Sequence, residues 1–346
     1  MLRLAAPVWA RRGYECGILA TGEDKGVYAE VLADAGYVVH HLPLQKSPAY
    51  FLRLARFIRS EGYTVVHQHA EGARYWFCLS ALAAGAKVAT TVHNNFQFNG
   101  QLRLRRALQR RHLERLGVVF IAIAPGVQKN EESRFGIRPR LIWNWFNTER
   151  FHPISTQERR SARSHFGYNE DDKVVVSLGN CSAVKDHSAL LQALVGLPDA
   201  KYLHIGEEDS AQSERTFANE LGVAERVQFT GWLANPRIAL ASADVYAMPS
   251  RYEGFSIAAL EAVGSGLPCL LASSPGLVDL AMLHLDLTYA QPESSDLATK
   301  LAVMFATIEQ LRPAARGNSA KIAKRLSPEV GAVAYADIYE ELACSR

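Results

Sequence analysis

Short runs of apolar and β-branched residues alternate along the chain with longer stretches in which apolar positions recur at helical spacing. Such alternation is typical of βαβ units, in which parallel strands form a sheet and helices cover its faces. The runs fall into two series, so we predict two doubly wound α/β halves. The first series of expected strands is 16–19, 37–42, 64–68, 87–92 and 118–123, and the second is 174–178, 201–205, 227–229, 244–247, 268–271 and 287–289.

An aromatic and turn-rich segment, 141–153, separates the two series, and a polar, charged stretch follows it over 155–164. The chain has 346 residues, of which 48% are hydrophobic, and this is long enough for two domains of ordinary size. We therefore expect two Rossmann-like domains with parallel sheets, over residues 1–150 and 151–326.

Both ends of the chain are expected to be helical. The first recognisable element, 2–11, is a helix, whereas a doubly wound sheet normally opens with a central strand and a glycine-rich turn. The first strand of the N-terminal domain is thus expected to be missing: either an upstream piece is absent from this chain, or another element fills the middle of the sheet. A last helix is expected over about 327–346 and can pack back on the first domain, because apolar residues share one stripe at Val333, Tyr335, Ile338 and Leu342.

Composition and charge exclude several classes of protein. The longest apolar runs, such as 118–124, are far shorter than the roughly 20 residues of a membrane-spanning helix. A net charge of +3 gives no electrostatic case for a nucleic-acid partner. Five scattered cysteines fit reduced thiols in the cytosol, and residues 4–10 contain Pro7 and lack the cleavage site of a secretory signal. We expect a cytoplasmic protein.

The most informative motif is Pro-Ser-Arg-Tyr-Glu-Gly-Phe-Ser at 249–256, between an expected strand and an expected helix. Ser256 can cap that helix, and the free amides and positive dipole end of the helix suit an anion such as a diphosphate. Glu253 in the loop and Glu261 about two turns into the helix would then flank the phosphates and accept hydrogen bonds from sugar and ribose hydroxyls. From the spacing alone, two solvated surface glutamates are an equally good interpretation.

This block resembles the glutamate-x7-glutamate motif of retaining GT-B glycosyltransferases of glycosyltransferase family 4, and the resemblance extends over nearly the whole chain. It implies an N-terminal acceptor-binding domain and a C-terminal domain that binds a nucleotide-sugar donor. It also implies that Glu253 contacts the donor hexose, that Glu261 contacts the ribose, and that the amides of Gly254, Phe255 and Ser256 meet the hexose or the diphosphate.

Further matches fall at other strand ends. Lys185 corresponds to the family's diphosphate-binding lysine, whereas Asn180 stands where an arginine is usual and supplies no charge. Arg251 is a possible substitute, with a solvated loop arginine as the alternative. Gly206 resembles the glycine at which the backbone approaches the nucleotide, and His93 resembles the histidine beside the transferred sugar.

Metal-dependent chemistry is disfavoured by the sequence. No pair of aspartates follows a strand, because 170–172 is an expected turn and 207–209 an expected loop. His67 and His69 are expected to serve the sheet end or the acceptor rather than a metal. The motifs of serine hydrolases and dinucleotide oxidoreductases are absent. We expect no cofactor, and a UDP-sugar is favoured over a GDP-sugar as the donor.

The segment 102–116 predicts a basic amphipathic helix, since it carries six arginines among its leucines. Such a helix could contact anionic lipid at the inner face of a membrane, or a lipid-linked acceptor. An ordinary solvated face is the alternative.

These expectations combine into a retaining, metal-independent hexosyltransferase with a glycan or lipid-linked glycan acceptor, in bacterial surface polysaccharide or lipopolysaccharide biosynthesis. His93, Lys185 and Glu253 are the expected catalytic residues. The alternatives are a non-catalytic nucleotide-sugar-binding protein and a GT-B nucleotide-sugar epimerase.

Overall fold

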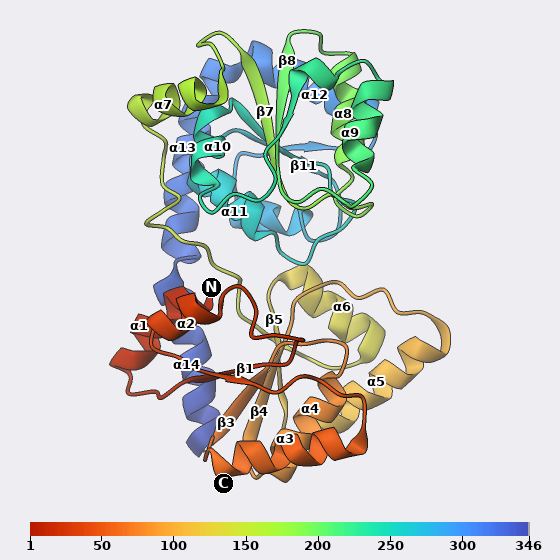
Figure 1. Cartoon of the computed structure of the whole chain (residues 1–346), viewed down its shortest axis with the longest axis vertical. Helices are drawn as coiled ribbons and strands as arrows, with labels where there is room; N and C mark the ends of the chain where they lie inside the picture. Colours follow the sequence, from red (N-terminus) through yellow and green to blue (C-terminus); the bar gives the residue numbers. More distant parts are fainter. Residues whose placement is uncertain (345–346) are drawn as a thin grey trace. The chain divides into compact units, whose positions relative to one another are not determined.

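The computed structural model describes residues 1–344, and Figure 1 shows its helices and strands. Contacts divide the chain into two units. Unit 1 is Met1–Trp145 together with Pro328–Arg346, and unit 2 is Phe146–Ser327. These divisions fall next to the positions 150 and 326 expected from the sequence.

Unit 1 contains two parallel sheets, one with the order β1-β2 and one with the order β3-β4-β5-β6. The expected helix at the start of the chain and the five expected strands are confirmed. The elements are α1 (Leu2–Arg11), β1 (Gly17–Ala20), α2 (Ala29–Asp34), β2 (Val38–His41), α3 (Pro48–Ser60), β3 (Val65–Gln68), α4 (Arg74–Ala83), β4 (Lys87–Val92), α5 (Gly100–Arg115), β5 (Val119–Ala122), α6 (Pro125–Phe135), β6 (Arg140–Leu141) and α14 (Pro328–Cys344).

Helices from opposite ends of the chain close the core of unit 1. Trp9 of α1 is buried, and its indole Nε1 donates a hydrogen bond to the carbonyl oxygen of Ala332 in α14 at 2.9 Å. Trp145 is also buried, and a Cβ at Gly331 would lie 2.0 Å from its ring. The glycine therefore makes the space in which α14 packs on Trp145.

Unit 2 is a single six-stranded parallel sheet with the order β12-β11-β10-β7-β8-β9. All six expected strands are confirmed. The elements are α7 (Thr156–Phe166), β7 (Lys173–Leu178), α8 (His187–Val195), β8 (Ala200–Ile205), α9 (Ser213–Glu220), a 3-10 turn (Ala224–Arg226), β9 (Val227–Phe229), α10 (Arg237–Ser242), β10 (Val245–Met248), α11 (Ile257–Gly264), β11 (Cys269–Ala272), a second 3-10 turn (Val278–Leu283), β12 (Thr288–Ala290), α12 (Ser294–Ala306) and α13 (Ile308–Arg325).

The core of unit 2 lies between this sheet and its helices. Fully buried aliphatic side chains of β7 and β10, such as Val175 and Val245, pack with Leu190 and Leu194 of α8 and Leu301 of α12. Apolar residues on both faces of the central strands account for their nearly continuous hydrophobic runs.

The expected amphipathic character of the segment 102–116 needs a correction. The helix α5 forms, but its buried residues are Ala107, Arg110 and Leu113. Leu104 and Leu108 are 63% and 59% exposed. Arg110 can be buried because its Nε donates to the Glu131 carboxylate at 2.6 Å. Leu104 and Leu108 therefore share the outer surface with most of the arginines, instead of lying on the opposite face.

Candidate functional site

Three loops of unit 2 meet at one edge of its sheet. They follow β7, β8 and β10, which are parallel neighbours in the order β10-β7-β8. The carboxyl ends of parallel strands share one edge, so the segments 179–186, 206–212 and 249–256 lie together there. Ligands of doubly wound folds bind at such a point, where successive connections run in opposite directions along the sheet.

The backbones of the loops after β7 and β8 lie in direct contact with each other. Gly206 has φ +146°, and a Cβ at this position would lie 2.2 Å from the carbonyl oxygen of Gly179. Next to this contact, the Oδ1 of Asn180 accepts a hydrogen bond from the amide of Glu207 at 3.0 Å. Glycine is thus required at position 206 for the two loops to pack together. The hydrogen bond to Asn180 joins the same two loops.

Lys185 and Glu253 form an ion pair across the loops after β7 and β10. The lysine Nζ lies 2.7 Å from Oε1 of Glu253, and both side chains are partly buried. A third loop supports the glutamate, because the Glu253 amide donates to the carbonyl oxygen of Pro275 at 2.9 Å. Gly276 permits this approach, since a Cβ there would lie 2.2 Å from the Glu253 carbonyl oxygen.

The helix α11 begins immediately behind Glu253. Ser256 caps it as expected, and its Oγ accepts a hydrogen bond from the amide of Ala259 at 3.3 Å. Gly254, Phe255 and Ser256 are buried on the approach to the helix. Glu261 lies further along α11, where burial raises its pKa to about 7 against the opposing effect of Arg150. Its carboxylate is therefore poorly solvated and can gain from a hydroxyl partner.

Arg251 lies in the same group of loops. Its amide donates to the carbonyl oxygen of Val184 at 2.9 Å, and its Nε donates to Oδ2 of Asp186 at the same distance. Asp186 was not identified from the sequence, although its position directly after Lys185 was a usable signal. The structure thus brings Asn180, Lys185, Gly206, Arg251 and Glu253 together.

His93 belongs to unit 1, directly after β4. Its Nε2 lies 2.9 Å from Nδ1 of His69, which follows β3. Surrounding protein atoms lower the pKa of His93 to about 4 and that of His69 to about 3, so both rings are neutral at pH 7. His67 has both ring nitrogens occupied, by Tyr339 at 2.6 Å and Thr91 at 2.8 Å. It serves the sheet end, whereas His93 offers a neutral imidazole.

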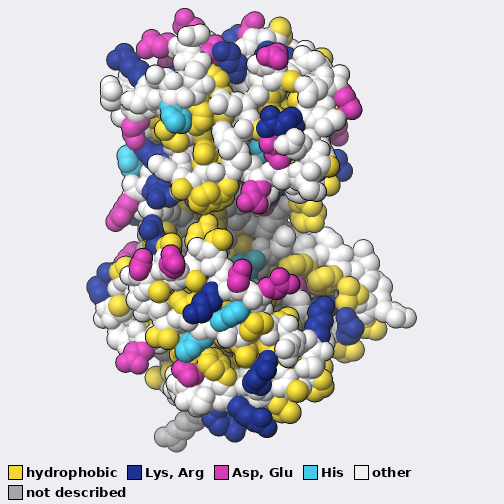
Figure 2. Space-filling model, in the orientation of Figure 1, with side chains coloured by type: hydrophobic (Ala, Val, Ile, Leu, Met, Phe, Trp, Pro, Cys, Tyr) yellow, Lys and Arg dark blue, Asp and Glu magenta, His cyan; other side chains and the backbone are white. Residues whose placement is uncertain are grey.

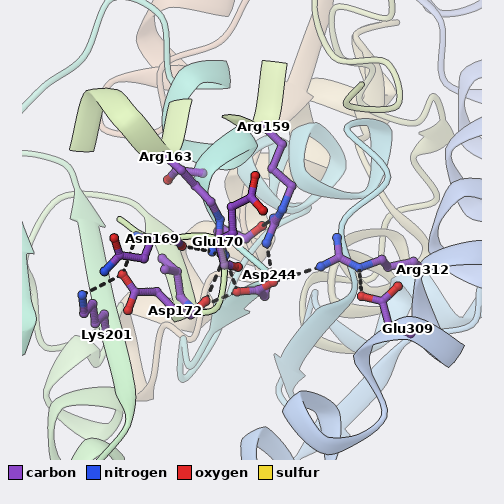
Figure 3. Close-up of polar contacts among 12 residues, drawn as sticks. Arg159, Arg163, Asn169, Glu170, Asp172, Lys201, Asp244, Glu309 and Arg312 are labelled. Carbon is purple, nitrogen blue, oxygen red and sulfur yellow. Dashed lines mark hydrogen bonds and ion pairs between the residues drawn. The ribbon is translucent and has the colours of Figure 1, made fainter. Parts of the chain in front are cut away.

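A hollow of about 410 Å³ lies at the opposite edge of the unit 2 sheet, beside the starts of β7 and β10. Figure 3 shows Arg159, Arg163 and Arg312 converging there on Asp244. The hollow is lined by as many carboxylates as basic side chains, so it has no surplus charge for a phosphate. Within residues 1–344, no cluster of three or more histidine, cysteine, aspartate or glutamate side chains has a metal-binding arrangement.

Solved structures share the fold of this protein. A glycosyltransferase from Rickettsia africae has a TM-score of 0.86 at 15% identity, covering 100% of this chain and 94% of its own. HepE from Anabaena, solved in complex with UDP and glucose, has a TM-score of 0.84 at 17% identity, covering 98% and 94%. The two Rossmann-like units, with the loop cluster at the strand ends of the second, have the GT-B glycosyltransferase fold.

Family models and relatives give the family. The model described as Glycosyltransferase Family 4 matches residues 2–179, and the model described as Glycosyl transferases group 1 matches residues 158–306. The chain belongs to glycosyltransferase family 4.

Relatives match this chain over different shares of their length. The putative glycosyltransferase EpsD of Bacillus subtilis is 26% identical over 76% of this chain and 72% of its own. Mannosylfructose-phosphate synthase of Agrobacterium fabrum is 29% identical over 46% of this chain, and the match spans only 38% of that relative.

Proposed function

We propose that this chain is a retaining glycosyltransferase that moves a hexose from a nucleotide-diphosphate sugar, with a UDP-sugar favoured over a GDP-sugar, to a glycan or lipid-linked glycan. The observation that carries this proposal is the Lys185–Glu253 ion pair beside the capped start of α11. One group of loops thus offers a cation and free helix amides, which suit a diphosphate, and a carboxylate, which suits a hydroxyl-rich sugar.

Each residue then has a physical task. Lys185 and the first amides of α11 stabilise the negative charge that develops on the departing diphosphate. Glu253 accepts hydrogen bonds from the hexose, and Glu261 accepts them from the ribose. His93, which is neutral at pH 7, positions the sugar through a hydrogen bond rather than through charge.

In the transfer step, the bond between the anomeric carbon and the diphosphate oxygen breaks, and a bond from the acceptor hydroxyl oxygen forms on the same face of the sugar. The hydroxyl proton passes to the leaving phosphate oxygen. No carboxylate needs to act as a nucleophile, so the demand on the protein is electrostatic and positional. In the proposed metal-independent reaction, the lysine and the start of the helix supply the charge stabilisation.

The acceptor is proposed to lie at an anionic membrane surface. The helices α3 and α5 carry three and four exposed arginines, and Glu114 is the one acidic residue in the sequences of α3, α4 and α5. Trp76, Leu104 and Leu108 are all more than half exposed among them. Figure 2 shows hydrophobic and basic side chains next to one another over α3 and α5. Exposed apolar and basic groups on one surface suit anionic lipid.

A surface-polysaccharide role draws support from relatives. The lipopolysaccharide core biosynthesis glycosyltransferase LpsE of Rhizobium meliloti is 32% identical over 31% of this chain and 31% of its own length. In the part of the chain that the structure describes, no helix is long and apolar enough to span a bilayer.

The first experiment measures thermal stabilisation by UDP, GDP and ADP, each with and without magnesium, followed by turnover of the matching nucleotide-sugars with membrane glycolipid acceptors. We expect one diphosphate to stabilise the protein independently of magnesium, because a ligand of the folded state raises its stability. Glu261→Gln should weaken binding about tenfold through loss of a charge-assisted hydrogen bond. Glu253→Gln should mainly lower turnover.

Glu220→Gln on α9 is the matched control, because this exposed glutamate lies outside the site. Unchanged binding and turnover in both site variants would contradict the assignment of the two glutamates. Donor binding without turnover would favour the non-catalytic alternative, and conversion of the donor without an acceptor would favour an epimerase. Retention is checked by the anomeric configuration of the product in NMR spectra.

A further inference from the structure

The loop after β7 presents only one cation to the proposed diphosphate, and that cation is already paired. Asn180 is neutral, and its Oδ1 is occupied by the amide of Glu207. Lys185 is held 2.7 Å from Glu253, which offsets its charge. A diphosphate carries two or more negative charges, so the positive charge of this loop alone does not neutralise it.

Arg251 forms hydrogen bonds with both residues that adjoin Lys185 in the sequence. Its amide binds the carbonyl oxygen of Val184, and its guanidinium Nε binds the carboxylate of Asp186, each at 2.9 Å. The two cations are therefore held side by side by backbone and side chain together. The Arg251 side chain is 64% exposed, so much of the guanidinium faces solvent. An arginine in this state has donors left for phosphate oxygens.

The burial, backbone conformation and hydrogen bonds of Asp186 are those of a residue that positions another side chain. It is buried and has φ +52°, in the left-handed region that side chains other than glycine rarely adopt. Its Oδ1 accepts a hydrogen bond from Ser188 at 3.0 Å, while Oδ2 holds Arg251. Strained conformations of this kind persist where the surroundings hold them in place, and they cluster at functional sites.

We propose that Arg251, oriented by Asp186, supplies the second positive charge for the donor diphosphate, in place of an arginine at position 180. Arg251 is then a diphosphate-binding residue, and Asp186 is a positioning residue that acts through it. The inference deepens the proposed function and rests on it, because it concerns the nucleoside diphosphate of the same site.

The test measures dissociation constants of UDP, GDP and ADP, and of the nucleoside of the best binder, for the full chain. Arg251→Gln should weaken binding of the best diphosphate about tenfold to a hundredfold, as expected for a hydrogen bond to a charged group. It should leave binding of the nucleoside unchanged. Arg251→Lys should retain part of the affinity. Arg160→Gln is the matched control, since that arginine is also 64% exposed but lies on α7.

A double-mutant cycle separates positioning from folding. Asp186→Asn keeps a residue that tolerates the left-handed conformation, and it should weaken diphosphate binding by about threefold. In the Arg251→Gln background, the same change should have no further effect. Asn180→Arg should restore affinity to the Arg251→Gln variant.

Three results would overturn the inference, and they can be told apart. Wild-type affinity of Arg251→Gln for the diphosphate, or additive effects of the two changes, would sink the inference while the donor site stands. Failure of the wild-type chain to bind any of the three diphosphates would overturn both the inference and the proposed function.

Discussion

Glu261 is the residue at which binding and stability are expected to conflict. Burial raises its pKa to about 7, above the value near 4.5 of a free glutamate. At pH values between about 4.5 and 7, Glu261 therefore takes up a proton when the protein folds. Its contribution to stability is fully present below pH 4.5 and is lost as the pH rises through 7.

Replacing this carboxyl by an amide should accordingly make the protein more stable at alkaline pH. One pKa unit corresponds to about 1.4 kcal/mol, so we expect Glu261→Gln to raise the free energy of unfolding by about 1–3 kcal/mol at pH 8 and by little at pH 4. Urea denaturation at the two pH values measures the difference. Equal stability of the variant and wild type at both values would contradict a buried, charged Glu261.

Asp244 connects several elements of unit 2 at the edge of the sheet remote from the loops after β7, β8 and β10. Its carboxylate accepts hydrogen bonds from Arg159 of α7 at 2.6 Å, Arg163 of α7 at 2.7 Å and Arg312 of α13 at 3.0 Å. It also accepts one from the amide of Val174 in β7 at 3.0 Å. The side chain of Asp244 is 8% exposed, so these bonds are shielded from water.

Loss of this one charge should destabilise the whole unit. Asp244→Asn leaves Arg163 buried without its carboxylate partner, and we expect a loss of about 3–5 kcal/mol in the free energy of unfolding. Glu309→Gln, at an 81% exposed partner of Arg312, should cost less than about 1 kcal/mol. Circular dichroism during urea unfolding compares the two, and equal effects would show that burial of Asp244 does not set the cost.

In the membrane role proposed above, the basic and apolar face formed by α3, α4 and α5 of unit 1 contacts the lipid. Aromatic contacts join the three helices into one surface. The ring centroids of Phe51 in α3 and Trp76 in α4 are 5.9 Å apart. The hydroxyl of Tyr75 in α4 forms a hydrogen bond of 2.8 Å with Nδ1 of His112 in α5. A lipid surface can therefore contact all three helices at once.

Binding to phosphatidylglycerol-containing vesicles should depend on both kinds of side chain. Arg103→Gln with Arg105→Gln removes two exposed charges, worth about 1 kcal/mol each at an anionic surface, or roughly thirtyfold in affinity together. Leu104→Ser with Leu108→Ser should also weaken binding. Co-sedimentation measures the effect, with pure phosphatidylcholine vesicles for comparison.

Val195→Ser with Val303→Ser is the matched control, because these valines are 54% and 56% exposed on unit 2. It should bind vesicles like the wild type. Equal binding of the wild type to neutral and anionic vesicles would count against the membrane role and favour an ordinary solvated surface.

Most elements of this protein can be predicted from its amino-acid sequence alone. The eleven expected strands, the opening and final helices, the cap Ser256 and the start of α11 all follow from periodicities and capping rules that act within a few residues. Most residues of the candidate site could also be named, because they lie in recognisable motifs at or shortly after strand ends, whereas Asp186 was missed. Such signals are local, so they survive without knowledge of which strands pair.

The contacts that those residues make with one another follow from the tertiary fold. The partners Lys185 and Glu253 are 68 positions apart, and Asp186 and Arg251 are 65 apart. Their contacts depend on β10 lying beside β7, and no periodicity encodes strand order. The exposure of Leu104 and the burial of Arg110 likewise depend on which neighbour packs against α5, including the buried Glu131. The pattern of the chain therefore fixes local conformation, whereas pairing and burial are set by contacts between distant segments.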